Sequence, residues 1–294
     1  MSDLSEMAHA KVNLTLRVLG RRADGYHDLA SLVAFADCAD RLSLEPGPEL
    51  RLETSGPGAA QCGDLADNLV IKAARLLADQ VPGLQLGRFT LDKQLPVAAG
   101  IGGGSADAAA ALRLLARANG LALDDPRLVE AARLTGADVP VCLASRSCLM
   151  TGVGEKLSPL EFPACAAVLV NPRVAVATAD VFKGLGLKNG EILTGVADVV
   201  RSLAWPKPGA SPAELLKTLT RGRNDLETPA IRLQPVIGEV LAALSDTMGV
   251  QVARMSGSGA TCFAIYEDAA AASAAASRLG TGHPGWWVHA GTLG

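Results

Sequence analysis

Apolar and polar residues alternate near the start of the chain. From Val12 to Arg17 every second residue is apolar. This period of two is typical of a strand with one buried face, and it predicts a strand over residues 8–19. A turn is predicted at Asp24-Gly25, followed by one or two further strands over residues 29–44.

Further along the chain, helical and extended patterns are mixed. Helices are predicted over residues 67–77, 121–134, 214–219, 231–246 and 268–279. Strands are predicted over residues 89–95, 149–157, 166–170, 251–254 and 261–266. Residues 188–212 hold several glycines and prolines and are predicted to be rich in loops. Because strands and helices do not alternate steadily, an α+β fold is favoured over a doubly wound sheet.

A glycine-rich stretch separates a short apolar segment from an alanine- and leucine-rich run. Its sequence is Leu95-Pro-Val-Ala-Ala-Gly-Ile-Gly-Gly-Gly-Ser-Ala-Asp-Ala-Ala109, and the run ends near Asn119. Glycines before a helix let the backbone approach a ligand, and the helix start offers N–H donors to anions, most often phosphate. No Gly-Lys-Ser/Thr follows, so it is not a Walker A loop. A tight glycine turn without a ligand is the alternative.

Composition narrows the ligand class. The chain has 294 residues, 49% hydrophobic and 19% charged, which suits a large buried core. Its formal net charge is −3 and its aromatic content is 3%. Nucleic-acid binding usually requires a basic surface or stacking aromatics, so it is not expected here. A small-molecule ligand is expected instead.

Cysteines, histidines and the N-terminus point to a plain intracellular chain. The cysteines form no Cys-x-x-Cys pair and do not cluster with the histidines, so reduced, mostly buried thiols are expected rather than zinc or disulfides. The residues are Cys38, Cys62, Cys142, Cys148, Cys165, Cys262, His9, His27, His283 and His289. No secretion signal and no apolar run of about 18 residues is present, so we expect a cytoplasmic protein without a membrane partner.

Three polar residues are candidates for chemistry. Lys11 and Asn13 lie two apart on the first predicted strand, so they share a face. Asp138 lies in Thr135-Gly-Ala-Asp-Val-Pro140, where an aspartate is commonly a turn or cap residue. A carboxylate near a lysine can also accept a hydroxyl proton while the lysine stabilises negative charge.

Two further segments carry candidate ligand contacts. Met255-Ser-Gly-Ser-Gly-Ala-Thr261 is a second glycine-rich turn between predicted strands, either a simple hairpin turn or a backbone clamp. Tyr26-His27 follows the Asp24-Gly25 turn. Such a pair is often an ordinary surface feature, but its rings can also stack on a base and hydrogen-bond to it.

Together these segments resemble the GHMP kinase superfamily. The resemblance rests on residues 11–29, 95–109, 136–140, 224–227 (Asn-Asp-Leu-Glu) and 256–260, in that order. Within the superfamily, the Asp-Gly-Tyr-His segment with Lys11 and Asn13 points to the member that acts on a cytidine diphosphate-linked methylerythritol. Ile101 and Ala106 depart from the common loop, where leucine and a second serine are usual, but both spare the glycines and Ser105.

The resemblance implies a two-lobed α+β fold with its active site in the cleft between the lobes. It implies an N-terminal ATP-binding domain over residues 1–160 and a C-terminal domain over 161–294. The implied reaction is ATP- and Mg²⁺-dependent phosphorylation of the 2-hydroxyl of the methylerythritol substrate, in the non-mevalonate route to isoprenoid precursors.

The resemblance also implies roles for individual residues. Asp138 is the expected base and Lys11 its charged partner, and Asn13, Tyr26, His27 and Phe182 are expected to bind the substrate. The residues expected to bind ATP are Asn68, Lys93, Pro96, Gly100, Gly102, Gly103, Gly104 and Ser105. The third glycine motif is Ser256, Gly257, Ser258 and Gly259. The resemblance does not identify the side chains that hold magnesium, and Ser105 is the best candidate.

Three alternatives stay open from the sequence. A dinucleotide oxidoreductase requires an acidic residue about 20 positions beyond the loop, and Asp124 and Asp125 lie there, in a predicted turn before Pro126. A non-catalytic nucleotide-binding module needs neither Asp138 nor Lys11. A kinase of the same fold with another substrate, such as mevalonate or homoserine, shares the glycine loops.

Overall fold

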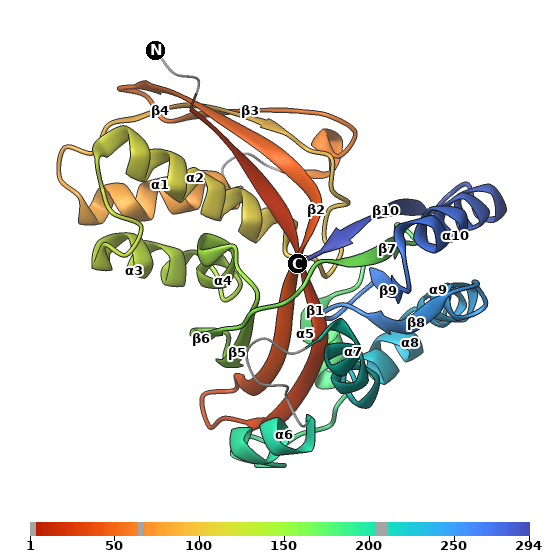
Figure 1. Cartoon of the computed structure of the whole chain (residues 1–294). Helices are drawn as coiled ribbons and strands as arrows, with labels where there is room; N and C mark the ends of the chain where they lie inside the picture. Colours follow the sequence, from red (N-terminus) through yellow and green to blue (C-terminus); the bar gives the residue numbers. More distant parts are fainter. Residues whose placement is uncertain (1–3, 64–66, 204–210) are drawn as a thin grey trace. The chain divides into compact units, whose positions relative to one another are not determined.

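Two long strands begin the chain in the computed structural model, which describes residues 4–63, 67–203 and 211–294 (Figure 1). The alternating segment forms β1 (Leu4–Arg21), and β2 (His27–Gly47) follows the predicted turn, where Gly25 has φ +91°. The chain folds into two compact units. Unit 1 comprises residues 1–11, 38–97 and 102–145, and unit 2 comprises residues 12–37, 98–101 and 146–294.

Unit 1 combines strands with helices. Its further strands are β3 (Arg51–Ser55) and β4 (Leu86–Asp92), and its helices are α1 (Leu69–Gln80), α2 (Gly103–Asn119), α3 (Pro126–Thr135) and α4 (Val139–Ala144). β3 pairs parallel with β4, which pairs antiparallel with the end of β2. Helix α1 packs against α2 and α3, and α2 against α4.

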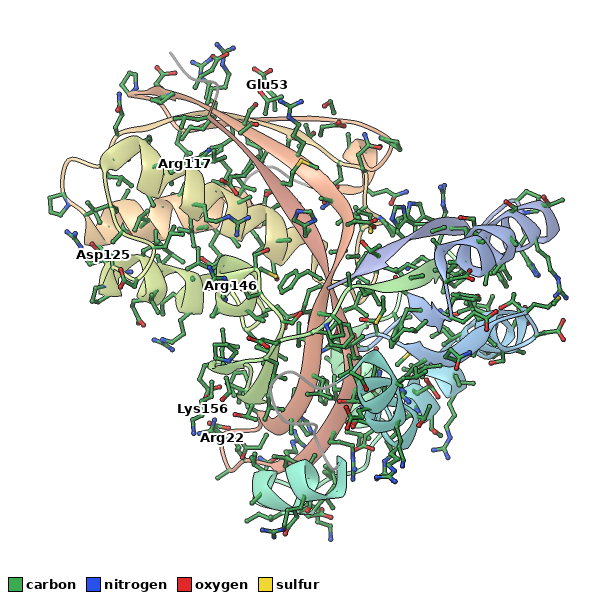
Figure 2. The ribbon with its side chains drawn as sticks, in the orientation of Figure 1. Arg22, Glu53, Arg117, Asp125, Arg146 and Lys156 are labelled. Carbon is green, nitrogen blue, oxygen red and sulfur yellow. The ribbon has the colours of Figure 1, made fainter. Side chains whose placement is uncertain are left out.

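The helix ends of unit 1 follow from local sequence. The Asn68 side chain accepts a hydrogen bond from the Val70 amide and caps α1. Gly120 ends α2 in the left-handed conformation, as the Asn-Gly stop predicts. Asp125, labelled in Figure 2, caps α3 through the Arg127 amide. The alanines in the middle of α2 are fully buried, because small side chains let neighbouring helices approach closely.

Unit 2 is a larger mixed unit. Besides the parts of β1 and β2 within residues 12–37, its strands are β5 (Cys148–Gly152), β6 (Lys156–Pro159), β7 (Cys165–Asn171), β8 (Val250–Met255), β9 (Cys262–Tyr266) and β10 (Trp287–Leu293). Its helices are α5 (Thr178–Lys183), α6 (Val196–Leu203), α7 (Pro212–Arg221), α8 (Glu227–Leu233), α9 (Val236–Ser245) and α10 (Ala269–Gly282). Strands β10, β7, β9 and β8 are antiparallel neighbours in that order.

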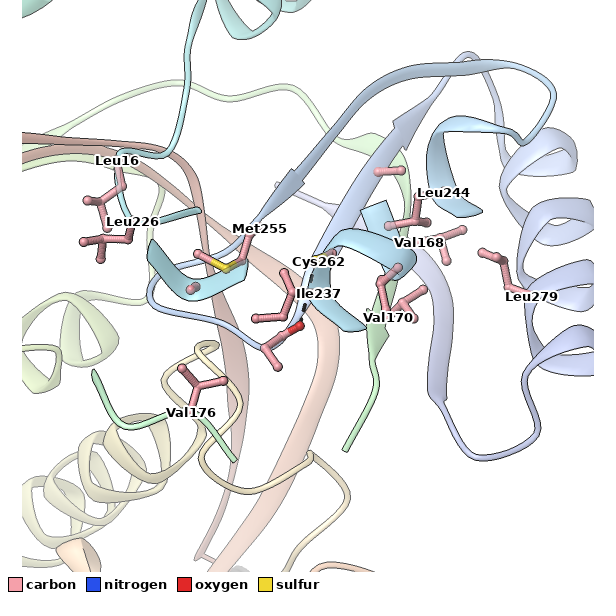
Figure 3. Packing of buried hydrophobic residues seen from close by; sticks show 14 of the residues in the cluster. Leu16, Val168, Val170, Val176, Leu226, Ile237, Leu244, Met255, Cys262 and Leu279 are labelled. Carbon is pink, nitrogen blue, oxygen red and sulfur yellow. Dashed lines mark hydrogen bonds between the residues drawn. The ribbon is translucent and has the colours of Figure 1, made fainter. Parts of the chain in front are cut away.

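The core of unit 2 lies between this sheet and its helices. Helix α10 packs against β10, β7 and β9, while α9 packs against β8 and β9. Ile237 and Leu244 of α9 are fully buried, as are Val168 and Val170 of β7 (Figure 3). Met255 lies at the end of β8 in the same cluster and leads directly into the second glycine turn. The apolar packing therefore fixes the strand ends from which that turn projects.

Several predicted elements differ in detail from the structure. Residues 29–44 lie in one strand, β2, and residues 121–125 are not helical because α3 begins at its Asp125 cap. The helix predicted over 231–246 is interrupted before Pro235, because proline lacks an N–H and restrains the preceding residue. The loop-rich stretch contains α6, and its residues 204–210 lie outside the described chain. The α+β class is confirmed.

Among the described residues, no helix combines the length and the apolar composition needed to span a bilayer. All six cysteines are free; Cys142, Cys148 and Cys262 are buried, and the other three are half-buried.

Candidate active site

The glycine loop ends at the start of α2 in unit 1. Gly102 occupies the N-cap position with φ +64° and makes no side-chain cap, so no side chain at this position competes for the N–H groups of the first helical turn. A Cβ atom at Gly102 would lie 3.3 Å from Cε of Lys11. The left-handed backbone therefore favours glycine here, and a Cβ atom would in addition press on the Lys11 side chain.

Lys11 connects this loop to Asp138. The Lys11 Nζ donates to Asp138 Oδ2 at 2.9 Å, and the side chains are 4% and 36% exposed. Asp138 precedes α4 at its N-cap position, yet its side chain makes no capping hydrogen bond. The structure thus brings Gly102, Lys11 and Asp138 together within unit 1, with a carboxylate that is partly open to solvent.

A second lysine lies beneath the same helix start. Lys93 is buried and forms ion pairs with Asp40 and with Asp107, whose Oδ2 is 2.6 Å away. The other carboxylate oxygen of Asp40 accepts from the amides of Gln94 and Leu95. A Cβ atom at Gly103 would lie 3.3 Å from Lys93 Nζ. The ammonium therefore supports the backbone of the loop from inside unit 1.

Asp107 is a buried acid with incomplete hydrogen bonding. Its Oδ1 has no hydrogen-bond partner among the described residues. Burial raises the pKa of Asp107 to about 7, and the nearby Asp40 carboxylate acts in the same direction, while Lys93 opposes both. Asp107 and Asp40 were not selected from the sequence. The only signal was an acidic residue inside an alanine-rich helix start and another in an apolar strand.

The raised pKa of Asp107 predicts a pH dependence of stability. Above a pKa near 4 the unfolded chain releases this proton, while the folded protein retains it up to about pH 7. The free energy of unfolding contributed by Asp107 therefore falls as the pH rises from about 4 to about 7. Urea unfolding at several pH values should show a shallower fall for Asp107→Asn, which mimics the protonated acid. Equal slopes in both proteins would contradict the prediction.

The first part of the glycine loop, residues 98–101, belongs to unit 2. Gly100 has φ +75°, and a Cβ atom there would lie 2.5 Å from the Gly259 carbonyl oxygen and 2.8 Å from that of Ser256. The Thr261 amide donates to the Ala99 carbonyl at 3.0 Å. The two glycine motifs therefore pack directly on each other, as a clamp between them requires.

Asn13 lies in the same network. Its backbone N–H donates to Ser256 Oγ at 3.0 Å, and its Nδ2 donates to Ser31 Oγ at 2.7 Å. Ser31 Oγ in turn donates to the Thr15 carbonyl. Asn13 is 1% exposed, so buried partners fix the orientation of its side chain.

The aromatic residues predicted to read a base lie in unit 2. The rings of His27 and Phe182 stack with centroids 4.6 Å apart and planes at 28°. Burial, and then the positive charge of Arg21, lower the pKa of His27 below its ordinary value, which favours a neutral ring. Tyr26 is 64% exposed, and its amide donates to Asp24 Oδ1 in the turn.

The remaining predicted ATP-binding residues are in unit 1. Asn68 caps α1, so its Oδ1 already accepts from an amide at 2.9 Å. Pro96 is half-buried in the loop after β4, Gly104 is exposed, and Ser105 is half-buried in the first turn of α2. In the third motif, Ser258 Oγ lies 2.8 Å from Thr178 Oγ1.

A resident metal centre would need several clustered ligands. Within residues 4–63, 67–203 and 211–294, no group of three or more His, Cys, Asp or Glu side chains is arranged to hold an ion. A magnesium ion carried by nucleotide phosphates needs only one or two protein ligands and otherwise keeps its waters.

The comparisons with known proteins agree with this geometry. Residues 68–146 match the GHMP kinase N-terminal domain, and residues 210–284 match the GHMP kinase C-terminal domain. The chain belongs to the GHMP kinases, and it is a small-molecule kinase. The dinucleotide oxidoreductase and the non-catalytic module are thereby excluded.

Individual relatives carry one particular name, 4-diphosphocytidyl-2-C-methyl-D-erythritol kinase. That of Rhodopseudomonas palustris is 68% identical over 290 residues, covering 99% of this chain and 97% of the relative. That of Bradyrhizobium diazoefficiens is 68% identical over 293 residues, covering 100% and 99%. A crystal structure of 4-(cytidine 5'-diphospho)-2C-methyl-D-erythritol kinase superposes with a TM-score of 0.76 at 35% identity, covering 99% of both chains.

Homoserine kinase from Cytophaga hutchinsonii shares the fold at 19% identity, with a TM-score of 0.72 over 100% of this chain and 95% of that one. At this identity the likeness extends to the fold alone.

Proposed function

We propose that this protein transfers the terminal phosphoryl group of ATP to the 2-hydroxyl of 4-diphosphocytidyl-2-C-methyl-D-erythritol, in the non-mevalonate route to isoprenoid precursors. The names of relatives that are 68% identical over nearly the whole chain support the substrate. The observation that carries the chemistry is the Lys11–Asp138 pair directly beside Gly102. We propose residues 1–160 and 161–294 as the two domains of this kinase, since they contain the two matched segments 68–146 and 210–284. The two compact units divide the chain differently.

In the proposed reaction, Asp138 accepts the proton of the attacking hydroxyl. Phosphoryl transfer depends mainly on positioning and on stabilising negative charge. The Lys11 ammonium, 2.9 Å from the carboxylate, orients Asp138 and faces the helix start at which the phosphates would lie. The partial exposure of Asp138, beside an almost fully buried Lys11, suits a base that must reach a substrate.

The ATP phosphates would lie on the N-terminal turn of α2. Gly102, Gly103 and Gly104 leave backbone N–H groups accessible, and the helix dipole favours an anion there. Gly100 and Pro96 would shape the preceding loop, while Asn68 and Lys93 would lie near the adenosine. A bound magnesium ion would neutralise phosphate charge, and the Ser105 hydroxyl is the side chain placed to contact it.

The substrate would be held by residues of unit 2. Asn13 would orient the methylerythritol group, and the stacked rings of His27 and Phe182 would support the cytosine together with Tyr26. The turn containing Ser256, Gly257, Ser258 and Gly259 would hold the start of the glycine loop, consistent with its packing on Gly100.

A phosphotransfer assay tests the proposed substrate. The purified protein is incubated with ATP, Mg²⁺ and one acceptor at a time: the cytidine diphosphate-linked methylerythritol, mevalonate or homoserine. We expect turnover only with the cytidine-linked acceptor. Faster turnover of mevalonate or homoserine would instead identify that compound as the acceptor and contradict the proposal.

Replacement of Tyr26 tests the base-reading role. The Tyr26→Ala variant is expected to lose at least about 2 kcal/mol in kcat/KM for the cytidine-linked substrate, because stacking contributes about 1–3 kcal/mol per base. Steady-state kinetics with saturating ATP measure the loss. Tyr26→Phe, which keeps the ring, is the control and should retain most activity. An unchanged kcat/KM in Tyr26→Ala would remove Tyr26 from the site and leave it an ordinary exposed residue.

A further inference from the structure

The Asn224-Asp-Leu-Glu227 segment is hydrogen-bonded to the second glycine turn. Asn224 Nδ2 donates to the carbonyl oxygens of Met255 and Gly257, both at 2.8 Å. Its Oδ1 accepts from the Leu226 amide at 2.9 Å. The residue is 6% exposed. Its Nδ2 group makes both of its hydrogen bonds to the turn, and its Oδ1 is used by Leu226. An aspartate or leucine cannot reproduce this pattern.

Glu227 holds the same turn from a second direction. Its carboxylate accepts from the Met255 amide at 2.9 Å, so both backbone polar groups of Met255 bond to this segment. Asp225, between them, accepts from the Val18 amide at 2.9 Å and from Arg17 at 3.1 Å. The segment is therefore anchored to β1 on one side and to the glycine turn on the other.

The second glycine turn also contacts residues of both proposed ligand sites. Ser256 Oγ accepts from the Asn13 amide at 3.0 Å and donates to the Gly100 carbonyl at 3.1 Å. Gly257 has φ +55°, and a Cβ atom there would lie 2.8 Å from the Gly100 carbonyl oxygen. A small displacement of the turn therefore shifts Gly100 or removes the hydroxyl from Asn13.

We propose that Asn224 and Glu227 are positioning residues, which set the place of Ser256 and thereby of the Gly100 backbone and Asn13. This positioning role rests on the proposed function, because Gly100 and Asn13 matter only if ATP and the acceptor bind there. Neither Asn224 nor Glu227 is assigned to contact a ligand. Their effect on binding is transmitted through the Met255–Gly257 backbone.

The Asn224→Asp variant tests this positioning role. Aspartate keeps the acceptor for Leu226 but replaces the two donors by an oxygen facing two carbonyls. We expect the affinity for a non-hydrolysable ATP analogue with Mg²⁺, measured by calorimetry, to fall about tenfold, because the displaced turn no longer holds the Gly100 backbone through Ser256. The KM values for both substrates should rise, while kcat at saturation changes less than about threefold, because no reacting group is removed.

A double-mutant cycle separates positioning from general destabilisation. If Asn224 acts through Ser256, then Asn224→Asp combined with Ser256→Ala should bind the analogue no more weakly than the weaker single variant. Affinities that fall multiplicatively, or an unchanged affinity in Asn224→Asp, would overturn the proposal. Should Asn224→Asp fail to fold, Glu227→Ala, which leaves the Met255 amide without its carboxylate, takes its place in the same cycle.

Asn119 provides a matched control. Its Nδ2 also donates to two carbonyls, those of Gln85 and Leu115, and its Oδ1 accepts from the Gln85 amide. Asn119→Asp should leave nucleotide affinity unchanged. Because the calorimetry requires no phosphoryl transfer, it still decides the role of Asn224 if the wild-type protein binds the analogue but does not phosphorylate the cytidine-linked acceptor.

Discussion

Replacement of Asp138 by asparagine is expected to lower kcat by about 10²–10⁴-fold, the usual contribution of a general base. Asparagine preserves the size of the side chain and can still accept a hydrogen bond from Lys11, which lies 2.9 Å from the carboxylate in the wild-type protein. It cannot accept the proton of the attacking hydroxyl. The affinity for the ATP analogue should therefore stay within about twofold, since the helix start at Gly102 is unaltered.

Steady-state kinetics give kcat for this variant, and calorimetry gives its nucleotide affinity. Glu130→Gln is the control, because Glu130 is an exposed carboxylate that pairs with Arg133 on the surface of α3 in the same unit. It should have wild-type kcat. A wild-type kcat in Asp138→Asn would remove Asp138 from the role of base, and a parallel loss of nucleotide affinity would indicate a structural role instead.

The sequence left two roles open for Asp138, a helix cap or a general base, and the geometry bears on the first of them. An aspartate after a helix end and before a proline is commonly a cap. Asp138 does occupy the N-cap position of α4, yet its side chain makes no capping hydrogen bond and instead pairs with Lys11. Local sequence predicted the position of the residue, but only the long-range pairing shows where its carboxylate points.

Local signals predicted the elements around the site well. The glycines before an alanine-rich run mark the start of α2, and Gly120 marks its end. The period of two from Val12 to Arg17 lies within β1. These features depend on neighbours within a few residues, which is the range over which caps, turns and hydrophobic periodicity operate.

Contacts between distant segments could not be predicted in this way. Lys93 was expected near the adenosine, but nothing in the local pattern shows that it is buried between Asp40 and Asp107. The hydrogen bond from Asn224 to the Gly257 carbonyl likewise joins residues 33 positions apart. Buried polar partners are chosen by tertiary packing, and a single sequence contains no direct record of that choice.

The division of the chain into compact units shows the same limit. Residues 98–101 belong to unit 2, whereas the loop from Gly102 onward belongs to unit 1. The period of two in β1 continues from Ala10 through Leu14 although the unit changes after Lys11. Both faces of this stretch are buried, because Lys11, Asn13 and Thr15 on the polar face are at most 3% exposed. The alternation therefore predicted the strand but not the elements that cover its second face.

Replacement of Arg254 by methionine is expected to reduce the free energy of unfolding by about 2–5 kcal/mol, because buried carbonyl acceptors lose a charged donor. Arg254 is 7% exposed, and its guanidinium donates to the carbonyls of Leu14 at 2.6 Å, Leu219 at 2.9 Å and Gly222 at 2.6 Å. Two of these carbonyls lie at the C-terminal end of α7, where a cation also stabilises the helix dipole. Methionine fills similar space but donates to none of them.

Urea unfolding followed by tryptophan fluorescence measures this loss in unit 2, because Trp286 and Trp287 belong to that unit. Arg278→Met is the control. Arg278 also donates to a carbonyl, that of Asp246 at 2.8 Å, but its side chain is 60% exposed, so water can replace it. Its substitution should change stability by less than about 0.5 kcal/mol. Equal midpoints for the two variants would show that the burial of Arg254 contributes no more than a surface hydrogen bond does.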